Sequence, residues 1–325
     1  MNKKAANTLK YLFFLALAIV LMYFAFRAIS FTDFVEGLKS ANYWLVAASV
    51  LTGIAAYILR ALRWKILIDS LGYNISAKNV YHATMIGYLA NFTIPRIGEI
   101  IRCTALKKTD NIAFEKSFGT VIVERCYDLL FLLLFLFLVI AIRFEVFGVF
   151  ISEKIYHPAI EKISNMSIYA FIGIFIFAVA IIFLFFHIRK KIKKNITGLI
   201  SGLKTGIKMK NRKIFFLYTI LIYLCYWMTG FLILKAIPTT ASLDIVDALF
   251  LFVIGAFGWV IPAQGGFGSY HILVALGLGV FGISYSDGII VATISHESQV
   301  IFMILLGLIS LVTVFVFSKK QNKKI

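Results

Sequence analysis

The chain has 325 residues, of which 61% are apolar and 15% charged, and its mean hydropathy is +0.92. Soluble domains carry about 25% charged residues, so this composition excludes a soluble globular fold and favours a membrane protein. The net charge is +18, from 33 Lys and Arg against 15 Asp and Glu, and the three cysteines form no CxxC pair, which argues against a disulfide framework or a metal site.

Six apolar runs are long enough to cross a hydrocarbon core of about 30 Å as helices rising about 1.5 Å per residue. The first run follows three lysines, but Phe26 and Arg27 stand where a signal peptide would have its small cleavage-site residues, so an uncleaved anchor is expected. The six runs are residues 11–29, 43–59, 118–142, 168–187, 214–234 and 288–317.

Two further apolar segments are interrupted. Residues 80–95 form a short segment that ends at Pro95 and leads directly into charged sequence, and residues 246–283 are broken by the proline and glycines of 259–268. Proline removes a backbone donor and clustered glycines favour non-helical backbone, so both segments are predicted to be broken or re-entrant helices.

The placement of the basic residues predicts the topology. Most lie before the first run, in residues 60–78, 96–116 and 189–213, and after the last run. The positive-inside rule is satisfied at every loop if segment 80–95 returns to the cytoplasm and segment 246–283 enters and leaves from outside. The predicted fold is therefore an all-α polytopic helical bundle in the cell (plasma or inner) membrane, with six full spans, two hairpins and both termini cytoplasmic. An eight-crossing version has the same parity.

The two halves of the chain, residues 1–160 and 161–325, each consist of span, span, broken hairpin and span. Both hairpins contain the pattern I-P-x-x-G, at residues 94–98 and 261–265, and both following spans contain T-x-x-x-E, at 120–124 and 293–297. Because the halves begin on opposite sides, an inverted-topology repeat within a single membrane domain is predicted, with a central site between the hairpins.

Three charged residues, Glu124, Arg125 and Asp128, interrupt an otherwise apolar span. The spacing places Glu124 and Asp128 on one arc of a helix and Arg125 within reach of Asp128. A charge facing lipid costs about 2.5–3.5 kcal/mol on insertion scales, so these groups should face the protein interior or water. They either line a polar pathway or form an ion pair that fixes helix packing.

Other polar residues are grouped around the predicted breaks. Arg96, Glu99 and Arg102 follow the first proline and are suited to phosphate binding, although they equally fit cytoplasmic anchoring. In the second segment Gln264, Gly265 and Gly266 offer neutral donors and close backbone approach, or simply tight packing. His296 and Glu297 resemble either a proton-relay pair or a hydrogen-bonded core pair. Arg60, Arg63 and Trp64 are expected to anchor a span end at the interface, with contact to lipid headgroups as the alternative.

Four motifs in order resemble a known family. LRALRW (residues 59–64), NFTIPRIGEIIR (91–102), VERCYD (123–128) and IPAQGGFG (261–268) are similar to the flippase-like membrane domain of the lysylphosphatidylglycerol synthase family. The resemblance covers nearly the whole chain. It implies headgroup passage by Arg96, Glu99, Arg102, Glu124, Arg125 and Asp128. In bifunctional members a separate C-terminal domain makes the aminoacylated lipid, and no such domain is expected within these 325 residues, so the chain is not expected to be an enzyme.

The leading hypothesis is a translocase for an anionic, aminoacylated or polyprenyl-phosphate lipid, with no cofactor and with movement that is downhill or ion-coupled. A second hypothesis is a non-transporting membrane subunit that docks or regulates a separate lipid-modifying enzyme. A third is a secondary transporter of a small anion. The expected partner is a membrane phospholipid or lipid-linked substrate, a homo-oligomer is left open, and nucleic acid is not expected because the basic segment lacks interleaved aromatics.

Overall fold

The computed structural model describes residues 3–164, 209, 211–261 and 263–322. The predicted span 168–187, most of the basic segment 189–213 and Pro262 lie outside the described residues. The described chain is helical without a strand, which confirms the all-α prediction. Its helices are α1 (Lys3–Phe26), α2 (Phe31–Ser40), α3 (Tyr43–Asp69), α4 (Ala77–Asn91), α5 (Gly98–Asp110), α6 (Phe114–Ile142), α7 (Phe144–Ile151), α8 (His157–Ser164), α10 (Arg212–Ala236), α11 (Ile245–Val260), α12 (Ser269–Leu278) and α13 (Tyr285–Asn322).

Four of the described helices, α3, α6, α10 and α13, are long and apolar enough to cross a membrane. They contain four of the six predicted spans. The first predicted span ends earlier than expected, at Phe26, and α1 and α2 form a bent pair with an angle of 86°. Ser30 caps α2 by accepting a hydrogen bond from the backbone N–H of Asp33, which fixes the start of the second arm.

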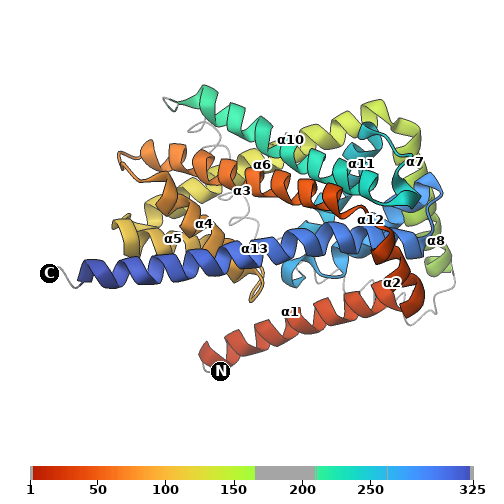
Figure 1. The fold of residues 1–325 in the computed structure, drawn as a ribbon, viewed down its shortest axis with the longest axis horizontal. Coiled ribbons are helices and arrows are strands. Elements are labelled where there is room, and N and C mark those ends of the chain that lie inside the picture. The colour runs from red at the N-terminus through yellow and green to blue at the C-terminus, as the bar shows by residue number, and fades with distance from the viewer. Residues whose placement is uncertain (1–2, 165–208, 210, 262, 323–325) are drawn as a thin grey trace.

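Both interrupted segments fold as pairs of packed helices, α4 with α5 and α11 with α12. Figure 1 shows the first pair toward one end of the long helices and the second pair toward the other end. Segment 80–95 differs from the prediction, because the apolar run forms only the first arm and the charged helix α5 forms the second. The polar arm is stable there because Arg102 pairs with Glu124 of α6.

The first hairpin is tight because two glycines meet where its arms cross. A Cβ on Gly98 would overlap the carbonyl oxygen of Gly87, so only glycine permits this approach. The Asn91 side chain accepts a hydrogen bond of 2.7 Å from the backbone N–H of Gly98 and thereby satisfies a donor at the start of α5. These contacts hold α5 close to the long helices.

The two hairpins make similar contacts with the long helices. Helix α3 packs along α10, α4 packs against α13, and α11 packs against α6, so each hairpin contacts a long helix of the other half. Helix α1 covers α12. The division into repeat halves at residue 160 remains a prediction. Figure 1 also shows the first residues of α1 and the last residues of α13 directed toward the same end of the bundle.

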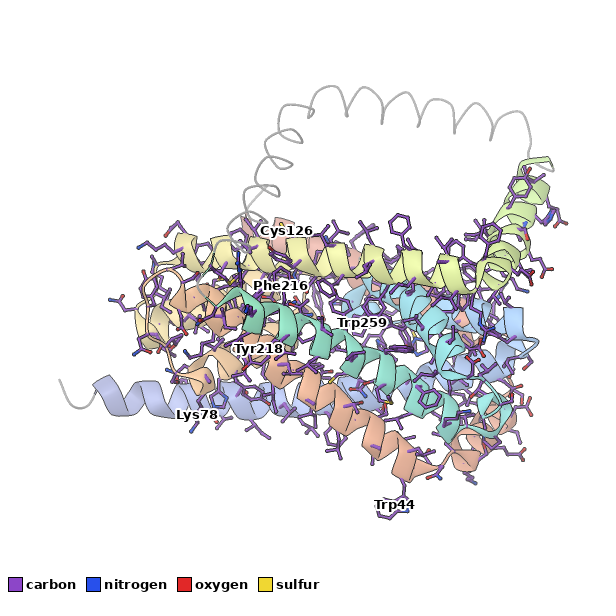
Figure 2. All side chains as sticks on the ribbon, turned by 90° about the horizontal axis from the view of Figure 1, so that it is seen from above. Trp44, Lys78, Cys126, Phe216, Tyr218 and Trp259 are labelled. Carbon is purple, nitrogen blue, oxygen red and sulfur yellow. The ribbon has the colours of Figure 1, made fainter. Side chains whose placement is uncertain are left out.

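The outer surface is apolar, as expected for contact with lipid tails. On α6, for example, Leu134 is 50% and Phe137 is 66% exposed. Trp44, at the start of α3, is 87% exposed, and Figure 2 shows it projecting away from the bundle. Tryptophan is enriched at membrane interfaces, so Trp44 marks one interfacial level. The sequence analysis did not single out this residue.

Candidate functional site

A buried carboxylate, Glu124 of α6, organises the first cluster of charges. Its Oε1 accepts hydrogen bonds of 3.1 Å from Nη2 of both Arg60 and Arg63, two side chains of α3. Its Oε2 accepts a bond of 2.9 Å from Nη2 of Arg102 on α5. Glu124 and Arg63 are completely buried, so three helices are joined by one ion-pair network in the interior.

Asp128, one turn further along α6, extends this network toward the surface. It accepts hydrogen bonds of 2.9 Å from Arg60 and 2.7 Å from Arg63, and Arg125 approaches it at 3.3 Å, the i,i+3 pairing expected from the spacing. Arg125 also donates a bond of 2.9 Å to Glu99 of α5. The Arg125 side chain is 43% exposed, so it forms the open edge of the cluster.

Aromatic and hydroxyl groups hold the charged side chains in place. The indole N–H of Trp64 donates to Thr120 Oγ1 at 2.9 Å, and the Arg102 guanidinium lies over the Trp64 ring at 4.3 Å from its centroid. Tyr223 of α10 donates a hydrogen bond to the backbone carbonyl of Asp128 at 2.7 Å. The cluster is therefore a rigid part of the helix packing on its inner side.

The cluster, defined as Arg60, Arg63, Glu99, Arg102, Glu124, Arg125 and Asp128, has more cationic than anionic groups. Four guanidinium groups face three carboxylates, which leaves one positive charge in excess. Among the described residues, the Nε–H groups of Arg60, Arg63 and Arg102 are buried without a hydrogen-bond partner, as is one acceptor, Glu99 Oε2. Buried donors and an uncompensated positive charge favour binding of an anion, and planar guanidinium groups suit phosphate in particular.

The breaks of the two hairpins meet beside this cluster. Gln264 donates a hydrogen bond of 2.6 Å to the backbone carbonyl of Thr93, and Arg96 donates one of 3.3 Å to that of Val260. Gly265 lies so close to Phe92 that a Cβ there would be 2.7 Å from the ring. Arg96 is exposed and has a positive φ of 64°, a conformation that costs a non-glycine residue about 1–2 kcal/mol. The two broken segments thus touch directly at their tips, and the central site predicted between them stays a prediction.

A second polar cluster lies on the other side of the tip contact and consists of His271 of α12 and His296 and Glu297 of α13. His296 is hydrogen bonded through Nε2 to the carbonyl of Gly265 at 2.8 Å, and its Nδ1 lies 3.1 Å from Glu297 Oε1. His271 Nε2 lies 3.5 Å from the same carboxylate oxygen. These three side chains have the ligand types and spacing that hold a metal ion, with all three atoms within 4.8 Å of one another.

The structure divides the predicted site residues into three groups. Glu99, Arg102, Glu124, Arg125 and Asp128 meet in the first cluster; Arg96, Gln264, Gly265 and Gly266 lie at the breaks; and Glu297 belongs to the second cluster. The expected interface anchors Arg60, Arg63 and Trp64 are instead buried in the interior, at 8%, 0% and 0% exposure. They lie there because α3 continues to Asp69, beyond the end of its apolar run.

Sequence reasoning missed His271. The sequence does contain a pattern that points to this histidine. The second arm of each hairpin carries a basic side chain about one turn after a glycine of the break. Arg102 follows Gly98 by four residues and His271 follows Gly268 by three. Each of these side chains lies near a glutamate on the next long helix, Arg102 near Glu124 and His271 near Glu297.

These features define a polytopic, all-α membrane protein with two broken hairpins and a buried charge cluster between its long helices. Residues 11–307 match the family described as "Lysylphosphatidylglycerol synthase TM region", so the chain belongs to this family. This assignment confirms the resemblance seen in the four sequence motifs.

Two curated relatives match part of the chain. It is 31% identical over 117 residues to "Glycosyltransferase AglD" of Haloferax volcanii, covering 36% of this chain and 18% of that protein. It is 34% identical over 100 residues to "UPF0104 membrane protein MJ1595" of Methanocaldococcus jannaschii, covering 30% of each. The chain thus spans less than a third of the length of either relative. No solved structure matches the chain.

Proposed function

We propose that this chain moves a phosphate-bearing membrane lipid between the two leaflets. The observation that carries the proposal is the buried charge cluster inside an apolar bundle, with its excess positive charge and three Nε–H groups that have no partner among the described residues. Burying charged side chains inside a membrane protein costs free energy. Such side chains therefore usually serve either helix packing or the passage of a polar ligand. A cluster that is fully compensated would serve packing alone, whereas an excess of cationic donors favours an anionic headgroup.

The geometry suggests the route of the headgroup. Arg125 is the most accessible cation of the cluster and is held by Glu99 and Asp128, which a phosphate would replace as its partners. Guanidinium groups bind phosphate through paired N–H donors, so Arg125 keeps an anionic partner during the exchange, and Asp128 keeps Arg60 and Arg63. The acyl chains would stay in the bilayer along the exposed apolar face of α6 while the headgroup passes Arg125. The proposal assigns no bond-making chemistry to this chain.

The proposed orientation in the cell membrane places the basic end of the bundle in the cytoplasm. The loops around Asp69 and Asp110 and the start of α10 carry lysines and arginines. At the opposite end, Asp33, Asp244 and Asp287 lie at the starts of α2, α11 and α13. The positive-inside rule then places both termini in the cytoplasm, and it brings the first hairpin in from that side.

Leaflet exchange in vesicles tests the proposal. Purified protein is reconstituted with trace fluorescent phosphatidylglycerol, polyprenyl phosphate or phosphatidylcholine, and a membrane-impermeant quencher reports the inner-leaflet fraction over time. We expect at least one of the two anionic lipids to exchange faster than in protein-free vesicles. In the same protein-containing vesicles, phosphatidylcholine should exchange more slowly than that anionic lipid. Equal rates with and without protein, or no preference for anionic headgroups, would contradict the proposal.

A second candidate function is a membrane subunit that docks a lipid-modifying enzyme. It is favoured by the relative named a glycosyltransferase, in which the matched stretch makes up 18% of a longer protein. A chain of this kind would co-purify with a soluble partner and show no leaflet exchange by itself. The vesicle experiment therefore separates the two functions directly.

A further inference from the structure

Two of the three side chains of the second polar cluster are buried in the interior. His271 and His296 are 0% and 2% exposed, and the His296 ring lies 5.1 Å, centroid to centroid, from the rings of both Trp259 and Phe267. The Glu297 side chain is 30% exposed and forms the one accessible wall. Buried polar side chains at such a position need partners, and within the described residues His271 has none of hydrogen-bonding geometry.

The hydrogen bonding of His296 leaves one position unaccounted for. The carbonyl oxygen of Gly265 only accepts, so the 2.8 Å contact requires that Nε2 of His296 carry the hydrogen. In the neutral imidazole Nδ1 is then a lone-pair acceptor, and it points at a carboxylate oxygen of Glu297 only 3.1 Å away. Two acceptors at this distance repel each other unless a proton or a metal ion lies between them.

His271 supplies a third atom that could bind a metal ion. Within the part of the chain that the structure describes, neither ring nitrogen of this buried side chain has a hydrogen-bond partner, and its Nε2 lies 3.5 Å from the same oxygen of Glu297. Three ligand atoms, namely His296 Nδ1, His271 Nε2 and Glu297 Oε1, therefore converge on one small volume.

The distances fit a tetrahedral ion. Zinc bonds of about 2.0–2.1 Å to nitrogen and oxygen place tetrahedral ligand atoms about 3.3 Å apart. The two separations to Glu297 Oε1, 3.1 and 3.5 Å, bracket this value. The two nitrogens lie within 4.8 Å of each other, and no hydrogen bond among the described residues opposes a small rotation of His271 that would close the set. A metal-bound histidine usually donates its other ring N–H to a carbonyl or carboxylate oxygen, which fixes the tautomer of the ring. The Gly265 carbonyl has this position for His296 and leaves Nδ1 as the atom that can bind an ion.

We propose that His271, His296 and Glu297 bind one divalent transition-metal ion, for which zinc is the best-fitting probe. Two imidazoles and a carboxylate are three protein ligands, and the partly exposed side of Glu297 gives the fourth position to water. None of the three ligands belongs to the charge cluster through which the lipid is proposed to move. The metal site is therefore a proposal separate from the proposed function.

Binding at this site would act on the contact between the two hairpins. His296 holds the carbonyl of Gly265, and the neighbouring Gln264 donates to Thr93 in the first hairpin. An ion that orders His296 therefore also orders the second break where it touches the first. The sequence alone predicts no metal site, because the cysteines form no ligand pattern and His271 is separated from His296 and Glu297 along the chain.

Calorimetric titration of zinc into the full-length chain tests the site. The protein is purified without a histidine tag, stripped with a chelator and kept in detergent, and His271→Ala and Glu297→Gln are compared with wild type. The matched control is His82→Ala, which removes another histidine of the helix bundle, one hydrogen bonded to Ser310. We expect one zinc ion per wild-type and control chain, and binding weakened by about 100-fold or more in the two site variants.

The cobalt spectrum of the wild-type protein keeps the proposal testable if a variant does not fold. Cobalt(II) in a tetrahedral nitrogen and oxygen site gives strong visible d–d absorption, which zinc should abolish by competition. Absence of zinc binding to wild type, or equal binding by His271→Ala, Glu297→Gln and His82→Ala, would overturn the proposal. A purely hydrogen-bonded or proton-sharing His–Glu pair would give the first of these results.

Discussion

Replacing Glu124 with alanine is expected to lower the free energy of unfolding by about 3–5 kcal/mol, because the change leaves buried cations without their counter-charge. Glu124 is completely buried and is the shared acceptor of Arg60, Arg63 and Arg102. Its loss removes the ion-pair partner of Arg102 on α5 and one of the two carboxylates that hold Arg60 and Arg63 of α3. Unfolding of the purified protein, followed by denaturant titration in detergent, measures the effect.

The control for this change lies on the same helix. Glu115 is exposed in the first turn of α6, so Glu115→Ala should cost no more than about 1 kcal/mol, through the helix dipole alone. Adding Arg102→Met to the Glu124→Ala chain should recover part of the lost stability, because it removes one uncompensated buried charge. If Glu124→Ala were as stable as Glu115→Ala, the cluster would not have the structural role described here.

Replacing Arg125 with glutamine is expected to reduce lipid movement by at least about tenfold while the protein stays folded. A charge-assisted hydrogen bond contributes about 1.5–3 kcal/mol, which corresponds to a loss of one to two powers of ten in rate if the phosphate depends on it. The Arg125 ion pairs are partly exposed, so their removal should change stability by at most about 1 kcal/mol. The initial rate of fluorescent phosphatidylglycerol exchange in vesicles is the measurement.

Arg143 provides a matched control at the far end of α6. Like Arg125 it is partly exposed, at 34% against 43%, and it contacts two carboxylates, Asp244 at 2.7 Å and Asp247 at 3.2 Å. It lies outside the charge cluster, so Arg143→Gln should leave the exchange rate within about twofold of wild type while losing comparable surface ion pairs. Equal rates for Arg125→Gln and Arg143→Gln would argue against headgroup passage at Arg125.

Much of the fold follows from local sequence. Runs of apolar residues located α3, α6, α10 and α13, and proline and glycine located both helix breaks. These features are predictable because a bilayer demands long apolar helices and because a break requires residues that cannot continue one. The helical spacing also placed Glu124 and Asp128 on one face of α6, where the structure has them.

The partners of these residues were not predictable in the same way. Arg60 and Arg63 were placed at a span end because the apolar run of α3 stops at Leu59, yet the helix continues to Asp69 and brings both arginines against α6. Hydropathy shows where lipid contact ends and does not show where a helix ends once its charges are paired inside protein. For the same reason the charged helix α5 was not recognised as the second arm of the first hairpin.

The most direct test of the central claim is to locate the headgroup on the protein. A phosphatidylglycerol analogue with a photoreactive headgroup is added to vesicles containing the full-length chain, and the labelled residues are mapped by mass spectrometry. We predict labelling around Arg125 and Glu99 on α6 and α5, removed by excess unlabelled phosphatidylglycerol and lost in Arg125→Gln. Labelling confined to the ends of the bundle, unchanged by competitor and by the substitution, would contradict the proposal that this cluster carries lipid.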